Sequence, residues 1–161
     1  MDNCTSGSPI SGSPTSGNPI SGSLVSGGIC AKLHEAFGGG CEIYEEEAKQ
    51  GLAPPCFIVA CVSQSVTPAV GARYSWSSLF SVTYFPKSGT DAQAECLGVQ
   101  DALFQALEYI EAGGAMIRGA GMRGALVDGT LVFTAGYSVH ARRATAAGGP
   151  MEDIRIQQKT K

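Results

Sequence analysis

No apolar run in this chain approaches the roughly 20 residues that a membrane-spanning helix needs. The N-terminus also has no basic stretch followed by a hydrophobic segment. We therefore expect a soluble protein without a secretion signal and without membrane contact. The 161 residues fit one domain, and 43% of them are hydrophobic, which is enough to build a core and excludes a wholly disordered chain.

Residue patterns that carry chemistry are scarce. The two histidines, His34 and His140, have no nearby nucleophile and orienting carboxylate, and no phosphate-binding G-x-x-x-x-G-K-[ST] loop is present. The six cysteines include no C-x₂-C pair of the kind that binds zinc. We expect reduced thiols, no metal, no cofactor and no catalytic residue. A small cytosolic enzyme that uses Cys56, Cys61 or Cys96 with a histidine is the less favoured alternative.

Charge is divided unevenly along the chain. Residues 1–111 carry 4 Lys/Arg and 11 Asp/Glu, a net charge of −7, whereas residues 112–161 carry 7 and 3, a net charge of +4. Opposite potentials of this kind favour association between like copies, although a chance distribution is the alternative. The overall charge of −3 makes specific nucleic-acid binding a poor interpretation, because that affinity comes largely from neutralised phosphates.

Composition divides the chain into three parts. A five-residue Ser-Gly-Pro repeat fills residues 6–25, where its spacing opposes a helix and its apolar surface is too small to offset ordering entropy. Periodicity is also lost after Gly148. We expect a flexible tail at 1–20, one domain at 21–144 and a C-terminal tail at 145–161.

Hydrophobic periodicity predicts a helix over 24–37 with Ser21 or Ser23 as N-cap, weakened by Gly27 and Gly28 and ended by Gly38. Short strands follow at 41–44, 56–64 and 78–85. The nearly continuous apolar run at 56–64 favours a central strand covered on both faces, paired with 78–85 through a long loop.

A second helix is predicted from Asp91 to about Ile110, where Gly113 and Gly114 end it. Strands 116–127 and 130–142 flank Asp128-Gly129, a strong hairpin signal, and the glycines at 119–124 fit a strand or bulge better than a nucleotide-binding loop. The order helix, three strands, helix, two strands indicates an α+β fold. Two main helices pack on an antiparallel or mixed sheet.

The segments KLHEAFG (32–38) and EIYEEEAKQGLAPPCFIV (42–59) resemble the tail terminator, or tail completion, proteins of tailed bacteriophages and prophages of Gram-positive hosts. The resemblance covers residues 24–140 in order and continues through GARY (71–74), YFP (84–86), ALEYIEAGG (106–114), MIRG (116–119) and VDGTLVF (127–133). The Ser-Gly-Pro repeat departs from the family pattern, in which the helix begins almost at once.

The resemblance implies a structural, non-enzymatic subunit of the virion tail or of a tail-like particle, assembled in the bacterial cytoplasm. Such subunits form a homo-oligomeric ring, a hexamer, that caps the tail tube, stops its polymerisation and provides the attachment surface for the neck and head. In contractile tails the ring also contacts the sheath, and DNA passes through its lumen. A neck or head–tail joining protein is the alternative within the same assembly.

Two candidate interfaces follow from charge and turn residues. In the first, an acidic run of one copy approaches an arginine of the next. The residues concerned are Glu45, Glu46 and Glu47, with Arg118, Arg123 or Arg142 opposite them. In the second, the loop 68–74 with Arg73 and Tyr74, together with the connection 51–55 around Pro54, docks on tube or neck subunits.

Overall fold

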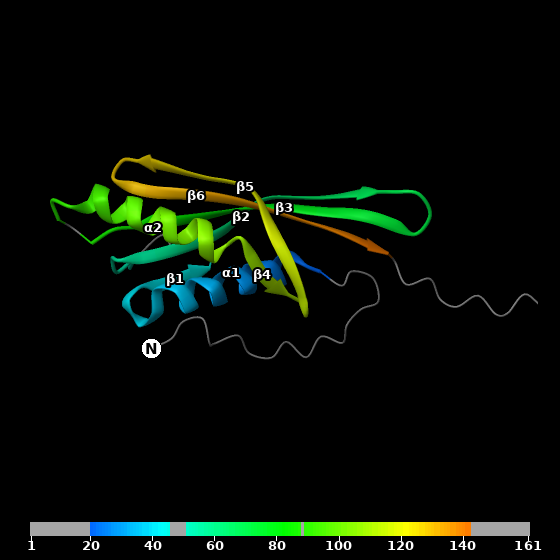
Figure 1. Cartoon of the computed structure of the whole chain (residues 1–161), viewed down its shortest axis with the longest axis horizontal. Helices are drawn as coiled ribbons and strands as arrows, with labels where there is room; N and C mark the ends of the chain where they lie inside the picture. Colours follow the sequence, from blue (N-terminus) through cyan, green and yellow to red (C-terminus); the bar gives the residue numbers. More distant parts are fainter. Residues whose placement is uncertain (1–19, 46–50, 88, 143–161) are drawn as a thin grey trace, which may run out of the picture.

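The computed structural model describes residues 20–45, 51–87 and 89–142 (Figure 1). The elements in chain order are α1 (Gly22–Phe37), the short 3₁₀ helix η1 (Gly38–Gly40), β1 (Glu42–Glu45), β2 (Cys56–Pro68), β3 (Arg73–Phe85), α2 (Ala92–Ala106), β4 (Tyr109–Ala112), β5 (Ala115–Val127) and β6 (Thr130–Arg142). The expected tails lie outside the described residues except for Ile20, which is buried. In the described ranges no helix has both the length and the apolar character needed to cross a membrane.

The strands form one sheet in the order β1-β2-β3-β6-β5-β4. Only the pair β1 and β2 is parallel, so the sheet is mixed, and the predicted α+β class is confirmed. Both helices pack on the same face, which we call the inner face. Phe37 of α1 lies 4.8 Å from Phe57 between ring centroids, and Phe104 of α2 lies 5.0 Å from Phe133. The opposite, outer face has no helix on it among the described residues.

Helix α1 begins at Gly22, two residues before the predicted start, and ends at Phe37 as predicted. The Ser21 side chain accepts a hydrogen bond from the Leu24 backbone N–H at 3.4 Å, and Gly38 ends the helix with φ of 62°. Val25, Ile29 and Leu33 are fully buried at four-residue spacing. These three side chains form the stripe with which the helix packs into the core.

The β2–β3 hairpin is longer than predicted. Both strands have 13 residues and only residues 69–72 join them, so the expected long loop is wrong. Serine and threonine residues occupy alternate, outward-facing strand positions within 65–77. This polar composition is typical of a loop, so the strands were not predicted there. The expectation that 56–64 is covered on both faces is wrong for the second half of that run. Every residue from Cys61 to Pro68 is exposed, because this half of the hairpin extends past the helices (Figure 1).

The predicted second helix is too long. Helix α2 ends at Ala106, and Tyr109–Ala112 forms β4, which pairs with Ala115–Arg118 of β5. Ile110 follows Leu107 at helical spacing, but it is buried as a strand residue that alternates with exposed neighbours. Pairing with β5 and burial against α1 override the local helical pattern here. The described part of the chain thus has three strands after α2 instead of two.

The C-terminal hairpin is confirmed. Asp128 and Gly129 have φ of 49° and 76°, the two positive values that a tight hairpin turn of this kind requires. The glycine-rich stretch at 119–124 contains a bulge, seen as a register shift between Ala120 and Arg123, with Gly121 at φ of 60°. The bulge bends β5 away from β6 toward β4 (Figure 1).

Candidate functional site

Two arginines face each other on the outer face of the sheet. Arg73 of β3 lies directly opposite Arg142 of β6 in the register, and both side chains are exposed. They occupy outward positions because Tyr74 and Ala141, the neighbouring pair, point to the core. Among the described residues neither arginine has a carboxylate partner. Like charges directly opposite each other destabilise a strand pair, so this arginine pair is suited to an external acidic partner.

The other predicted basic residues differ in what they contact. Arg118 donates to the Glu108 carboxylate at 3.3 Å, and its guanidinium lies 5.8 Å from the centroid of the Tyr109 ring. Arg123 is exposed on β5, opposite Thr134 of β6, and forms no ion pair with a described residue. Arg118 is therefore occupied within its own chain, whereas Arg123 and the arginine pair are available to a second molecule.

The acidic run lies only partly in the described residues. Glu45, at the end of β1, accepts a hydrogen bond from the Cys30 thiol, with Sγ and Oε1 3.4 Å apart. Glu46 and Glu47 lie outside the described residues. Asp101 is an exposed acid on α2, whereas Glu35 on α1 is paired with Lys32, with Nζ and Oε2 2.8 Å apart. Exposed acids without a described ion pair therefore lie on α2 and β1, while the outer sheet face presents arginines.

The predicted docking loop is a narrow hairpin tip. Val70 is 93% exposed and Arg73 is exposed beside it, but Tyr74 is only 6% exposed and belongs to the core. Pro54 is exposed just before β2, at the other end of that strand. The exposed half of β2 behind the tip has no signal in the sequence, although Val62 and Val66 are 57% and 50% exposed there.

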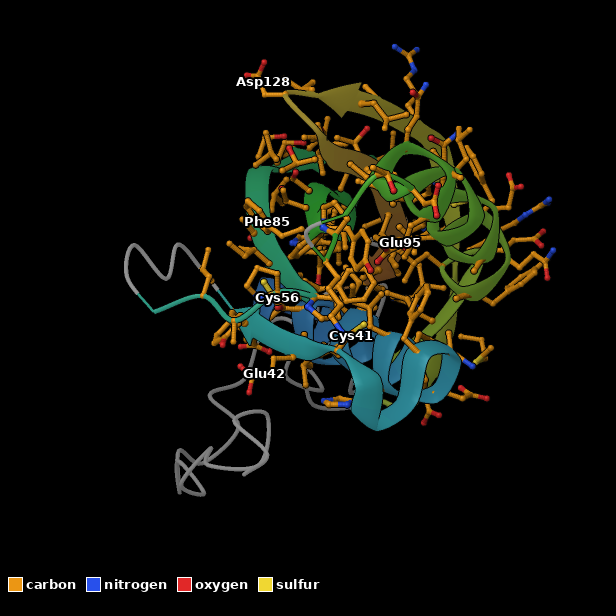
Figure 2. The ribbon with its side chains drawn as sticks, turned by 90° about the vertical axis from the view of Figure 1, so that its left-hand side faces the viewer. Cys41, Glu42, Cys56, Phe85, Glu95 and Asp128 are labelled. Carbon is orange, nitrogen blue, oxygen red and sulfur yellow. The ribbon has the colours of Figure 1, made fainter. Side chains whose placement is uncertain are left out.

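Thiols gather where β1, β2 and α2 meet (Figure 2). Burial raises the pKa of the Cys41, Cys56 and Cys96 thiols, and a nearby carboxylate raises each further. A thiol with a raised pKa is a weak nucleophile. In the described ranges no group of histidine, cysteine and acidic side chains is arranged to hold a metal ion.

Two buried tyrosines give the fold a pH dependence. Burial raises the pKa of Tyr84 and of Tyr137; the Tyr84 hydroxyl donates to Glu95, which raises its pKa further, and the Tyr137 hydroxyl donates to the Leu107 carbonyl at 3.0 Å.

The folded chain therefore holds these protons more tightly than the unfolded chain, whose tyrosines titrate at about pH 10. The stabilisation is fully present below that pH and is lost above it. We expect urea unfolding to show a free energy of unfolding that begins to fall above about pH 8.5, where thiols of the unfolded chain ionise while Cys41, Cys56 and Cys96 of the folded chain stay protonated, and that falls further above about pH 10. A rise over that range would contradict the assignment.

Comparisons with known proteins agree with the resemblance. A family model described as phage tail terminator protein matches residues 25–148. No curated protein sequence matches the chain. Among 21 matching chains of solved structures, one that carries no descriptive name aligns over 78% of this chain and 98% of its own length, with 12% identity and a TM-score of 0.37.

Proposed function

Because the chain belongs to the phage tail terminator protein family, and is thereby a structural component of a phage tail, we propose that it forms a ring that caps the tail tube. The ring is a hexamer, stops further addition of tube subunits and provides the attachment surface for neck proteins. In a contractile tail it also contacts the sheath, and DNA passes through its lumen without specific binding. This role places the protein at the end of the tail, assembled in the host cytoplasm.

The distribution of charge supports a ring. A closed ring of identical copies needs two different surfaces that meet head to tail. Asp101 of α2 and Glu45 of β1 are exposed acids on the side of the sheet that carries the helices, and the arginines of the outer face are the candidate opposite surface. We propose that the acidic run Glu45–Glu47 of one copy contacts Arg123 of the next, since Arg123 lacks a carboxylate partner among the described residues and Arg142 belongs to the arginine pair proposed to bind the tube.

The observation that carries tube binding is the pair of arginines beside the tip of the β2–β3 hairpin, neither of which has a carboxylate partner among the described residues. Arg73 and Arg142 lie on adjacent strands next to the tip at Val70, and β2 and β3 carry this end beyond the helices (Figure 1). Arginine is a frequent anchor at protein interfaces, and an acidic surface on the tube subunit would remove the repulsion within the pair. The connection around Pro54, at the opposite end of β2, is then available for neck subunits.

Tube polymerisation in vitro tests the function. When the purified chain is added to polymerising subunits of the cognate tube, we expect shorter tubes, because each bound ring stops one end from growing. Electron microscopy measures the length distribution, and an unrelated protein of similar net charge is the control. Tubes of unchanged length would refute capping. Binding to the portal-side connector without shortening would identify the chain as a neck or head–tail joining protein.

A further inference from the structure

The sheet has two open edges of equal length. Strand β1 pairs only with Cys56–Val59 of β2, and β4 pairs only with Ala115–Arg118 of β5. The remaining residues of those strands, 60–68 of β2 and 119–127 of β5, have no strand on their outer side among the described residues. Each open segment is nine residues long. The Gly119 N–H already donates to the Glu108 carbonyl at 2.7 Å, and the outward backbone groups that follow it in β5, like those of the β2 segment, are available for pairing with another strand.

These edges lack most of the usual protection against pairing. Exposed edges are normally blunted by lysines, other charges or prolines within the strand. Arg123 is the one charged residue in the two open segments, and Pro68 stands only at the end of β2. Large apolar side chains are instead exposed along them: Val62 (57%), Val66 (50%), Leu126 (39%) and Val127 (49%). Such an edge is a site of aggregation unless another strand covers it.

Each open segment also contains a bulge, between Cys61 and Ser63 in β2 and between Ala120 and Arg123 in β5. A bulge can protect an edge, but it also increases twist and curvature. Regular strand remains beyond each bulge, at 63–68 and 123–127. The bulges therefore curve the sheet and leave an edge long enough to pair.

The two edges are complementary in direction. Successive antiparallel pairings from β2 through β3 and β6 make β5 run opposite to β2. A rotation that places β5 of one copy beside β2 of the next therefore produces an antiparallel pair.

We propose that the open segment of β2 pairs with the open segment of β5 in a second copy of this chain, which joins the sheets of neighbouring subunits into one continuous sheet around the ring. This inference rests on the proposed ring and names the contact that closes it. The two surfaces differ, so the contact is head to tail. The open segments lie toward opposite ends of the sheet, so adjacent copies are displaced along the strands, and closure of any sheet into a barrel requires such a stagger.

Charged substitutions on each edge test this contact. Val66→Lys blocks the β2 edge and Val127→Lys blocks the β5 edge, at side chains about half exposed in the single chain. Val70→Lys at the hairpin tip, where the side chain is 93% exposed, is the matched control. Circular dichroism verifies that all three variants fold, and sedimentation velocity measures assembly.

We expect either edge variant to raise the concentration needed for half-maximal assembly by roughly tenfold or more, because a lysine on an edge strand opposes its pairing with a second strand. The control should assemble like the wild type. A mixture of Val66→Lys and Val127→Lys should stop at a dimer, since each variant retains the one edge that the other has lost. Edge variants that assemble normally, or a mixture that yields full rings or only monomers, would overturn the proposal.

Hydrogen exchange separates this inference from the proposed function. In the assembled wild type, amides of 60–67 and 120–127 should be protected relative to the monomer. A ring in which they exchange as in the monomer, or edges protected only when tube subunits are added, would overturn the edge pairing and leave capping intact. A wild-type chain that never assembles, alone or on tube ends, would overturn both.

Discussion

Gly28→Ala is expected to destabilise the protein by about 1–3 kcal/mol, whereas Gly27→Ala, one residue earlier in α1, is expected to stabilise it by about 1 kcal/mol. A Cβ on Gly28 would lie 2.4 Å from the carbonyl oxygen of Glu111 and 3.3 Å from its carbonyl carbon. That carbonyl belongs to β4, which is fixed by its pairing with β5, so the helix would have to move away from the sheet.

Gly27 is the matched control because it has the same helical backbone, and a Cβ added there would meet no heavy atom within 4 Å. Alanine at this position removes only the intrinsic helix penalty of glycine. Urea unfolding of the two variants measures both free energies. Similar changes of the same sign would show that the contact between α1 and β4 is not close.

Arg142→Glu is expected to abolish tube capping without loss of fold stability. The substitution replaces the repulsion across the arginine pair with an attraction to Arg73, a gain of about 0.2–1 kcal/mol in the free energy of unfolding. It also presents a carboxylate to the acidic partner that the pair is proposed to bind. Stability and capping should therefore change in opposite directions, as expected for a functional site that costs stability.

Lys87→Glu is the control for Arg142→Glu. Lys87 is exposed just after β3, at the opposite end of that strand from Arg73, and the substitution changes the net charge by the same amount. Tube lengths with this variant should equal those with the wild type. Normal capping by Arg142→Glu, or equal loss with both variants, would argue against a specific role of the arginine pair.

Local signals predicted the elements whose determinants are local. The Ser21 cap, the Gly38 stop and the Asp128-Gly129 turn each set a boundary through one or two residues, and all three are confirmed. Strand β4 was missed because Ile110 continues a helical pattern, and only its pairing with β5 makes it a strand. Likewise, nothing in the sequence shows that Gly28 lies against β4 while Gly27 faces open space.

The candidate site was predictable only in part. The sequence shows that arginines concentrate in the C-terminal third, but the placement of Arg73 opposite Arg142 is a consequence of strand register. Tyr74 was expected beside Arg73 in an interface. The inward and outward alternation of β3 instead buries it at 6% exposure, and its position in the strand could not be known while 67–74 was interpreted as a loop. Likewise, β2 and β5 have open edges because β1 and β4 each cover only part of them, and the sequence does not show where those two short strands end.

Imaging of tube ends tests the central claim most directly. Tubes grown with the purified chain should show, by electron microscopy and class averaging, one closed ring of density on one end of each tube and none along its length. Copies of the chain scattered along the tube wall, or bare ends in the presence of excess protein, would contradict the account.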